Sequence, residues 1–179
     1  MNDHVWYAAY GSNLWFSRFR LYLEGGSHPD VQAGRRFAGC RNRTLPTDVR
    51  AAELPVEMYF ARASTLWDGG GVAFVQPSKA HRWPCRLYRI TRGQYLDVVQ
   101  QENGDNPDGR FDDAVDLATI FGSGWYSRGL VIDQLDDLTI VTCTEPQRSP
   151  ANPPAPAYLD VIRRGLVEMG LTPDALLPG

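Results

Sequence analysis

The stretch of sequence that decides the expected fold is residues 5–14, which read VWYAAYGSNL. The first six of these residues are apolar or aromatic on both faces, a pattern typical of a central strand that is covered on both sides. The Gly-Ser-Asn step at residues 11–13 then ends the strand. The sequence therefore predicts a buried strand that runs directly into a turn.

A helix is expected immediately after this turn. From Leu14 onward, apolar side chains recur at i, i+4, i+7 and i+8, and two glycines at residues 25–26 supply a stop. The apolar stripe consists of Trp15, Phe19, Tyr22 and Leu23. The chain is thus expected to open as strand, turn and helix.

The middle of the chain alternates strand candidates with turns. Strands are expected at residues 56–61, 72–75, 85–90, 125–132 and 138–143, and the glycines at residues 69–71 have turn chemistry. The arginine-rich residues after the first helix are expected to form a loop with a short strand around Phe37. Thr91 is expected to cap a helix over residues 92–102.

The end of the chain is expected to return to the body of the protein. A proline-rich connector at residues 146–157 is followed by an amphipathic helix at residues 158–169, which Gly170 ends. Strands separated by helices and by hairpin-like turns predict a mixed sheet or small barrel. No internal repeat is visible, so we expect one domain over residues 1–179.

Charge and composition argue against polymer or membrane partners. The net charge is −3, and Lys79 is the only lysine among 18 basic side chains. Residues 35–50 are locally basic, but no base-stacking motif accompanies them, so we expect a solvated loop and no nucleic acid. No segment approaches the roughly 18 consecutive apolar residues of a membrane span. The sequence gives no indication of oligomeric state.

The N-terminus and the cysteines bear on the cellular compartment. The chain begins MNDH and lacks a basic and apolar export signal, so we expect a cytoplasmic protein. Cys40, Cys85 and Cys143 are an odd number of widely spaced cysteines, which does not suggest disulfides or a metal site. We expect three buried thiols.

Two features could carry chemistry. The turn at residues 11–13 can converge backbone N–H groups on an anion such as a carboxylate, although Ser12 and Asn13 are also ordinary helix caps. Glu102 shares an apolar stripe with Tyr95, Val98 and Val99 near a helix C-terminus, where desolvation and the helix dipole would both raise its pKa. That suits a general acid and base, but a glutamate in a terminal turn is commonly just solvated.

Other constellations fit less well. The three histidines, His4, His28 and His81, lack zinc-site spacing, so a metal-dependent deacetylase has no visible ligands. Residues 103–114 fail as a calcium loop, because the sixth residue is Asp108 and the twelfth is Ala114. We therefore expect no metal and no cofactor.

The motif at residues 10–14 resembles the YGSNL signature that opens γ-glutamyl cyclotransferase-like proteins. Members of that family carry a glutamate at the end of a helix written roughly LDxxE. Residues 98–102, VVQQE, match its spacing but have valine in place of the leucine and the aspartate. Residues 158–166 resemble the closing helix of the family. The resemblance thus involves both ends of the chain and the middle.

The resemblance implies a fold and a reaction. The fold would be α+β, a small mixed parallel and antiparallel β-barrel flanked by helices. In the reaction, the α-amine of a small γ-glutamyl substrate attacks its own γ-carbonyl, giving 5-oxoproline and a free amine. Glu102 would move the proton, and Tyr126, placed in a late strand, would be an extra hydrogen-bond donor or a core residue. The implied substrate-binding residues are Tyr10, Gly11, Ser12, Asn13, Leu14 and Tyr126.

Alternatives remain open at this stage. The same fold could be a noncatalytic module that binds a small carboxylate or a peptide terminus, or an amide hydrolase that releases free glutamate. The two valines in the helix motif and the arginine-rich insertion also leave the substrate open. A γ-glutamyl amino acid, a γ-glutamylamine or a γ-glutamyl-protected intermediate would each fit better than glutathione.

Overall fold

A computed structural model describes residues 3–29, 31, 34–112 and 114–178. Its main sheet has five strands in the order β2-β5-β1-β7-β6, and β3 and β4 form a separate sheet of two strands. The strands are β1 (His4–Ala9), β2 (Asp48–Leu54), β3 (Val56–Ala61), β4 (Val72–Pro77), β5 (Trp83–Thr91), β6 (Arg128–Leu135) and β7 (Leu138–Thr144). The helices are α1 (Phe16–Glu24), α2 (Arg92–Glu102) and α3 (Pro156–Glu168), with single 3-10 turns η1 (Ser12–Leu14), η2 (Thr65–Trp67) and η3 (Pro173–Ala175).

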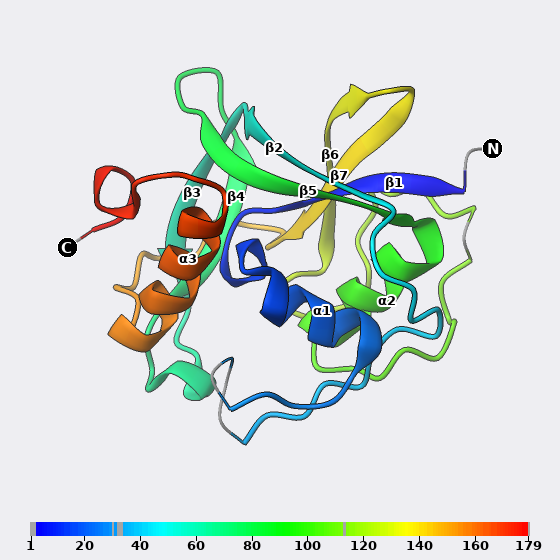
Figure 1. Cartoon of the computed structure of the whole chain (residues 1–179), viewed down its shortest axis with the longest axis horizontal. Coiled ribbons are helices and arrows are strands. Elements are labelled where there is room, and N and C mark those ends of the chain that lie inside the picture. Colours follow the sequence, from blue (N-terminus) through cyan, green and yellow to red (C-terminus); the bar gives the residue numbers. More distant parts are fainter. Residues whose placement is uncertain (1–2, 30, 32–33, 113, 179) are drawn as a thin grey trace.

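Figure 1 shows how these elements are arranged. Helices α1 and α2 lie together on one side of the main sheet, and α3 lies beside the β3–β4 hairpin. The η1 turn sits between these two groups, directly after β1. The end of the first strand is therefore the place where the main sheet, the hairpin and the helices meet.

Strand β1 is the centre of the main sheet, as the sequence predicts. It pairs antiparallel with β5 from His4 to Ala9 and parallel with β7 at Trp6 and Tyr7. No side chain from Val5 to Ala9 is more than 3% exposed. A strand that is covered on both faces needs apolar residues at every position, which explains its continuous apolar run.

The mixed α+β class is confirmed, but the sheet is not a closed barrel. Strands β2 and β6 are its two edges, and β3 and β4 pair with each other instead of closing it. The hairpin is attached through a side chain: Thr144 Oγ1 accepts from Val75 N at 3.2 Å and donates to Val75 O at 2.7 Å. This hydroxyl bridge leaves a gap in the strand ladder where a barrel would continue.

Several element boundaries differ from the sequence-based expectations. Strand β2 was not predicted, because it is an edge strand whose side chains are mostly exposed and show no apolar alternation. Phe37 forms only an isolated bridge with Gly26. Strand β6 begins at Arg128, so Tyr126 lies in the preceding turn and not in a strand. Helix α1 begins at Phe16, after the separate η1 turn, and α3 begins at Pro156.

Helix α2 has the predicted cap and bounds. Thr91 Oγ1 accepts from Gln94 N at 3.1 Å, and Gln94 Oε1 accepts from Thr91 N at 3.0 Å, which makes a capping box. The helix is buried from Gln94 to Gln101 on nearly all sides, so it is not a simple amphipathic helix. The cap fixes where the helix starts, and Glu102 is its last residue.

The arginine-rich segment covers α2. Asp97, in the middle of the helix, accepts hydrogen bonds from Arg41 N at 2.8 Å and from Arg41 Nε at 2.9 Å. Gln94 Nε2 donates to Thr44 O at 2.8 Å, and Gln101 Oε1 accepts from Gly39 N at 3.1 Å. Three polar side chains of α2, those of Gln94, Asp97 and Gln101, are thus bonded by residues 39–44, and this part of the expected solvated loop has a structural role.

The proline-rich connector runs along the β3–β4 hairpin. Asn152 N donates to Phe60 O at 3.1 Å, and Gly71 N donates to Pro153 O at 2.8 Å. Glu145 anchors the start of the connector by accepting from Tyr59 Oη at 2.9 Å and from Ser149 N at 2.7 Å. The connector therefore fastens the hairpin to the entry of α3.

Two further expectations concern the cysteines and membrane-spanning helices. All three cysteines are buried free thiols, as predicted. Among the described helices, none is both long enough and apolar enough to pass through a membrane.

Helix α3 packs on the η1 turn at a glycine, which predicts the effect of one substitution. A Cβ added to Gly165 would lie 2.5 Å from both Leu14 Cβ and Trp15 N. Replacing glycine by alanine inside a helix normally gains about 1 kcal/mol. Here we expect Gly165→Ala to lower the free energy of unfolding by about 1–3 kcal/mol, because the methyl group forces α3 away from the turn.

Urea denaturation measures this effect, with Val167→Ala on the exposed side of the same helix as the control. Val167 is 61% exposed, so its substitution should change stability by no more than about 0.5 kcal/mol. An unchanged or increased stability of Gly165→Ala would contradict the close packing.

Candidate active site

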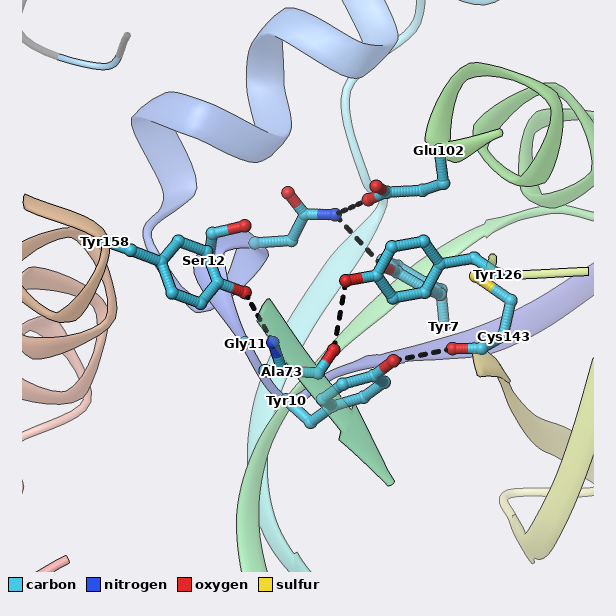
Figure 2. Close-up of a pocket in the computed structure, with 10 residues that line it drawn as sticks. Tyr7, Tyr10, Gly11, Ser12, Ala73, Glu102, Tyr126, Cys143 and Tyr158 are labelled. Carbon is cyan, nitrogen blue, oxygen red and sulfur yellow. Dashed lines mark hydrogen bonds between the residues drawn. The ribbon is translucent and has the colours of Figure 1, made fainter. Parts of the chain in front are cut away.

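The η1 turn approaches the hairpin so closely that only glycine fits at its start. A Cβ added to Gly11 would lie 2.9 Å from Ala73 Cβ and 3.3 Å from Tyr158 Oη. Figure 2 shows Gly11 next to Ala73, with the Tyr158 hydroxyl hydrogen-bonded to the Ala73 nitrogen. Strand β1 delivers the turn, β4 supplies Ala73 and α3 supplies Tyr158. Three elements that are distant in sequence therefore meet at this point.

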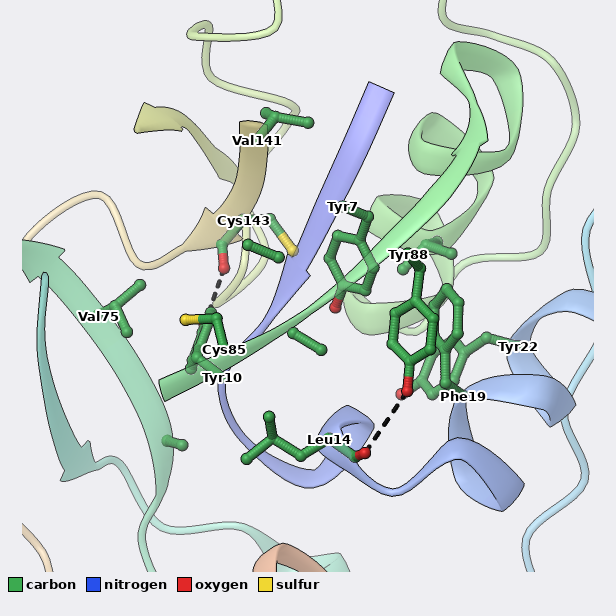
Figure 3. Close-up of a cluster of buried hydrophobic side chains, with 14 of the residues drawn as sticks. Tyr7, Tyr10, Leu14, Phe19, Tyr22, Val75, Cys85, Tyr88, Val141 and Cys143 are labelled. Carbon is green, nitrogen blue, oxygen red and sulfur yellow. Dashed lines mark hydrogen bonds between the residues drawn. The ribbon is translucent and has the colours of Figure 1, made fainter. Parts of the chain in front are cut away.

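An aromatic side chain of the core, Tyr88, anchors the η1 turn. Tyr88 Oη donates to Asn13 O at 3.0 Å and lies 3.5 Å from Leu14 O (Figure 3). The Tyr88 ring stacks on Phe19 with ring centroids 4.1 Å apart. Because β5 and α1 hold this tyrosine from both sides, the carbonyl groups of the turn have a fixed direction.

Glu102 reaches the turn from the end of α2. Its Oε1 accepts a hydrogen bond from Asn13 Nδ2 at 2.7 Å (Figure 2). The same Nδ2 donates to Tyr7 Oη at 3.1 Å, so both amide protons of Asn13 are used. Asn13 Oδ1 is buried and has no hydrogen-bond partner among the described residues. The Asn13 side chain thus connects Tyr7 to the Glu102 carboxylate and carries a buried acceptor that these contacts leave unused.

Tyrosine hydroxyls line the rest of the pocket. Tyr126 Oη donates to Ala73 O at 3.0 Å, and Tyr158 Oη accepts from Ala73 N at 3.0 Å. Tyr10 Oη donates to Cys143 O at 2.8 Å. These hydrogen bonds fix the rings, so the walls of the pocket are rigid before any ligand arrives.

Burial keeps the tyrosine hydroxyls and the cysteine thiol of the pocket protonated. Loss of solvent raises the pKa of Tyr7, Tyr10 and Tyr126 well above the ordinary value for tyrosine, and the charge of Glu102 adds to the effect in each case. Burial and the charge of Glu102 likewise raise the pKa of the Cys143 thiol. Cys143 is therefore a thiol and not a nucleophilic thiolate.

The pocket is small and opens into a larger cavity. The inner pocket, of about 30 Å³, contains the Asn13 and Glu102 contact. An outer cavity of about 170 Å³ shares Ser12, Glu102, Tyr126 and Tyr158 with it. A ligand that touches Glu102 can thus extend outward past the two tyrosines.

The structure brings most of the predicted site residues together. Those that line the inner pocket are Tyr10, Gly11, Ser12, Asn13, Glu102 and Tyr126. Leu14 does not line it: the side chain is fully buried in the core, and Leu14 N donates to Gly11 O at 2.9 Å within the turn. Leu14 therefore shapes the turn from inside.

Sequence reasoning missed Tyr7, Ala73, Cys143 and Tyr158 as pocket residues. Tyr7 stands three residues before Tyr10, and Tyr158 is the first aromatic residue of the closing helix. Both therefore lie in segments that the sequence already connects with the fold, residues 5–14 and 158–166. Nothing local marks Ala73 or Cys143, which are brought in by the pairing of distant strands.

Metal ligands are not grouped in this site. Among the residues that the structure describes, no three His, Cys, Asp or Glu side chains form a cluster that could hold a metal ion.

The fold is similar to that of solved structures. A γ-glutamyl cyclotransferase matches with a TM-score of 0.61 and 18% identity, over 98% of this chain and 89% of that one. An uncharacterised human protein matches with a TM-score of 0.59 and 17% identity, over 99% and 90% of the two chains. YkqA from Bacillus subtilis matches with a TM-score of 0.54 and 17% identity, over 97% of this chain and 51% of that one. The chain has the γ-glutamyl cyclotransferase-like fold, but identities this low say nothing of the reaction.

Comparison of sequences gives a different kind of relative. No model of a protein family matches the chain. Histone deacetylase 5 of Arabidopsis thaliana is 35% identical over 189 residues, which cover 93% of this chain and 28% of that protein. The chain therefore spans less than a third of the length of this relative. That name describes the whole of the longer protein, and histone deacetylation is a different reaction from cyclotransfer. Neither activity is therefore assigned to this chain from the name of a similar protein.

The contact between Asn13 and Glu102 predicts a pH-dependent effect of Asn13→Asp. The variant would place a second carboxylate where an amide nitrogen lies 2.7 Å from Glu102 Oε1. Repulsion raises the pKa of the pair in the folded protein, so the destabilisation is absent at low pH and grows as the pH rises. We expect the free energy of unfolding to fall by about 1–3 kcal/mol more at pH 8 than at pH 4.

Asn13→Ala is the control, since it loses the same hydrogen bonds without adding a charge. Its effect in urea denaturation should be nearly the same at both pH values. If the two variants show the same pH dependence, residue 13 and Glu102 are not in contact.

Proposed function

We propose that this protein is a γ-glutamyl cyclotransferase, which converts a γ-glutamyl amide into 5-oxoproline and a free amine. The observation that carries the proposal is the Asn13 side chain: its Nδ2 donates to the Glu102 carboxylate at 2.7 Å, and its buried Oδ1 has no partner among the described residues. An ammonium group needs acceptors, and an acceptor left open in a buried pocket is costly unless a ligand fills it. The similarity of fold and the YGSNL signature agree with this chemistry.

The substrate's own α-amine is the nucleophile in this mechanism. Its ammonium form would donate to Asn13 Oδ1 and to Glu102, and Glu102 would remove one proton. The free amine then attacks the γ-carbonyl carbon, so a new C–N bond closes the five-membered ring. The amide C–N bond breaks, and Glu102 returns the proton to the leaving nitrogen.

The protein mainly has to hold the bent substrate. Intramolecular attack in the right geometry reaches effective molarities of about 10⁵ M or more, so no enzyme nucleophile is required. Asn13 would fix both partners, because its Nδ2 orients the Glu102 carboxylate while its Oδ1 orients the amine. We assign the backbone amides of Ser12 and Asn13 to the γ-carbonyl oxygen, since the Leu14 amide already donates to Gly11 O.

The sizes of the cavities support one arrangement of the two parts of the substrate. The inner pocket of about 30 Å³ has room for only a few atoms, so it would hold the amine end next to Asn13. The γ-carbonyl would lie at the mouth between Glu102 and Ser12, and the leaving group would lie in the outer cavity. The neutral tyrosines around the mouth would exclude water and so favour cyclisation over hydrolysis.

Release of 5-oxoproline from γ-glutamyl dipeptides and γ-glutamylamines tests the proposal. Glu102→Gln keeps the shape of the side chain but cannot take up a proton, so we expect kcat to fall by at least about a hundredfold. Glu24→Gln is the matched control, because Glu24 is also the last residue of a helix but pairs with Arg20 at the surface. Its kcat should equal that of the wild type.

The product separates the alternatives. Free glutamate in place of 5-oxoproline would identify an amide hydrolase, and ligand binding without any product would identify a binding module. Full release of 5-oxoproline by Glu102→Gln would support the cyclotransferase reaction but contradict the proton-transfer role of Glu102.

A further inference from the structure

Aromatic side chains are prominent in the lining of the outer cavity. Four of the described residues that line it are aromatic: Trp67, Trp125, Tyr126 and Tyr158. Tyr126 and Tyr158 are both hydrogen-bonded to the backbone of Ala73 (Figure 2). The Trp67 ring lies against Tyr158 with ring centroids 5.1 Å apart. This aromatic lining begins at the reacting centre, because its two tyrosines also line the inner pocket.

Trp125 is the most exposed member of this lining. Its side chain is 37% exposed, and no other aromatic side chain in the described part of the chain is as exposed. Tryptophan is strongly buried on average, so an exposed tryptophan beside a cavity is informative. Leu66, which is 58% exposed, lines the same cavity. Two exposed apolar side chains thus border the space that the leaving group would occupy.

The loop that carries Trp125 is fixed to the end of α2. Tyr126 N donates to Asn103 Oδ1 at 2.9 Å, and Asn103 directly follows Glu102. The Asn103 side chain also occupies the space where a Cβ on Gly124 would lie, so the loop and the helix end are in close contact. Trp125 therefore has a fixed position relative to Glu102.

Arg62 supports the Trp125 ring. The guanidinium carbon of Arg62 lies 5.6 Å from the centre of the Trp125 ring, which is within the range of a cation–π contact. Arg62 Nε donates to Glu145 Oε2 at 3.0 Å, and the Glu145 side chain is buried. The ring is thus held before a ligand arrives, which lowers the entropic cost of binding.

Three polar side chains of the outer cavity already contact other parts of the protein. Gln101 Nε2 donates to Tyr22 O at 2.9 Å, and its Oε1 accepts from a backbone amide at 3.1 Å. The guanidinium groups of Arg18 and Arg35 lie over the Phe37 ring at 5.4 Å and 4.4 Å. A leaving group therefore need not satisfy these three side chains, whereas covering the exposed aromatic surface is favourable.

We propose that the leaving amine carries an aromatic ring, which binds in the outer cavity against Trp125. This inference rests on the proposed cyclotransferase reaction and names its substrate class. An apolar cavity of about 150 Å³ can hold benzene, so the outer cavity of about 170 Å³ has room for one ring. Contact between aromatic rings adds to the gain from burying them. The reacting γ-carbonyl stays at Glu102 while the ring lies against Trp125.

Three matched γ-glutamylamides test the proposal by release of 5-oxoproline. We expect kcat/KM for the 2-phenylethylamide to exceed that for the ethylamide by at least about tenfold, because only the former buries a ring. The 2-cyclohexylethylamide has a ring of similar size that is not aromatic. It should react about threefold less efficiently than the 2-phenylethylamide.

Trp125→Ala is the informative variant, because the side chain is partly exposed and its loss spares the core. It should lower the ratio of kcat/KM for the 2-phenylethylamide to that for the ethylamide by at least about fivefold, mainly through KM. Comparing ratios between variant and wild type cancels the different reactivity of the two amines. Trp125→Phe keeps an aromatic ring and should retain most of the preference.

Ile120→Ala is the matched control. Ile120 lies five residues before Trp125 and is 52% exposed, but it is not among the residues that line the outer cavity. The ratio for this variant should equal that of the wild type.

Equal kcat/KM for the 2-phenylethylamide and the ethylamide, or a preference that Trp125→Ala retains, would overturn the aromatic site. Equal kcat/KM for the phenyl and cyclohexyl compounds would contradict the aromatic requirement.

Failure of the proposed reaction is distinguishable from failure of the site. If the wild type releases no 5-oxoproline from any compound, the reaction fails, and binding decides the site separately. Titration calorimetry would then use the 2-phenylethyl and ethyl monoamides of glutaric acid, which lack the α-amine and cannot cyclise. Tighter binding of the phenyl compound that is lost in Trp125→Ala would support the site, and equal binding of the two compounds would reject it.

Discussion

Close packing around the turn after β1 is the constraint on which the rest of the site depends. Gly11 lets the turn touch β4, and Gly165 lets α3 approach the same turn from the other side. Tyr88 fixes the carbonyl of Asn13 from the core below. Because these contacts are closely packed, the backbone of the turn has a fixed conformation. This conformation directs the Asn13 side chain toward the end of α2.

The opposite wall of the site is set by how α2 is buried. Several of its polar side chains bond to neighbouring segments, including the hydrogen bonds from Arg41 to Asp97 and from Gly39 to Gln101. The arginine-rich segment therefore holds the helix that ends in Glu102, and at Arg35 it also lines the outer cavity. The position of the carboxylate and the shape of the outer cavity depend on the same stretch of chain.

Local signals in the sequence predict the parts of the fold that local hydrogen bonds determine. The cap residue Thr91 predicts α2 with its bounds, and the apolar run before Tyr10 predicts the central strand. Strand β2 escapes prediction because an exposed edge strand has no apolar period. The sequence pattern left a mixed sheet and a small barrel open, and the barrel that the resemblance implies is not closed, because β3 and β4 pair with each other. The predicted Glu102 and the turn come from separate segments, while Cys143 enters the pocket only through tertiary packing.

The central claim is that the turn and Glu102 hold a bent γ-glutamyl group, and a crystal structure of Glu102→Gln with a γ-glutamyl dipeptide tests it most directly. The account predicts the substrate's α-nitrogen within hydrogen-bond distance, about 2.6–3.2 Å, of both residue 102 and Asn13 Oδ1. It also predicts that the leaving group extends past Tyr126 into the outer cavity. A substrate bound elsewhere, or one in the pocket with its α-nitrogen turned away from residue 102, would contradict the account.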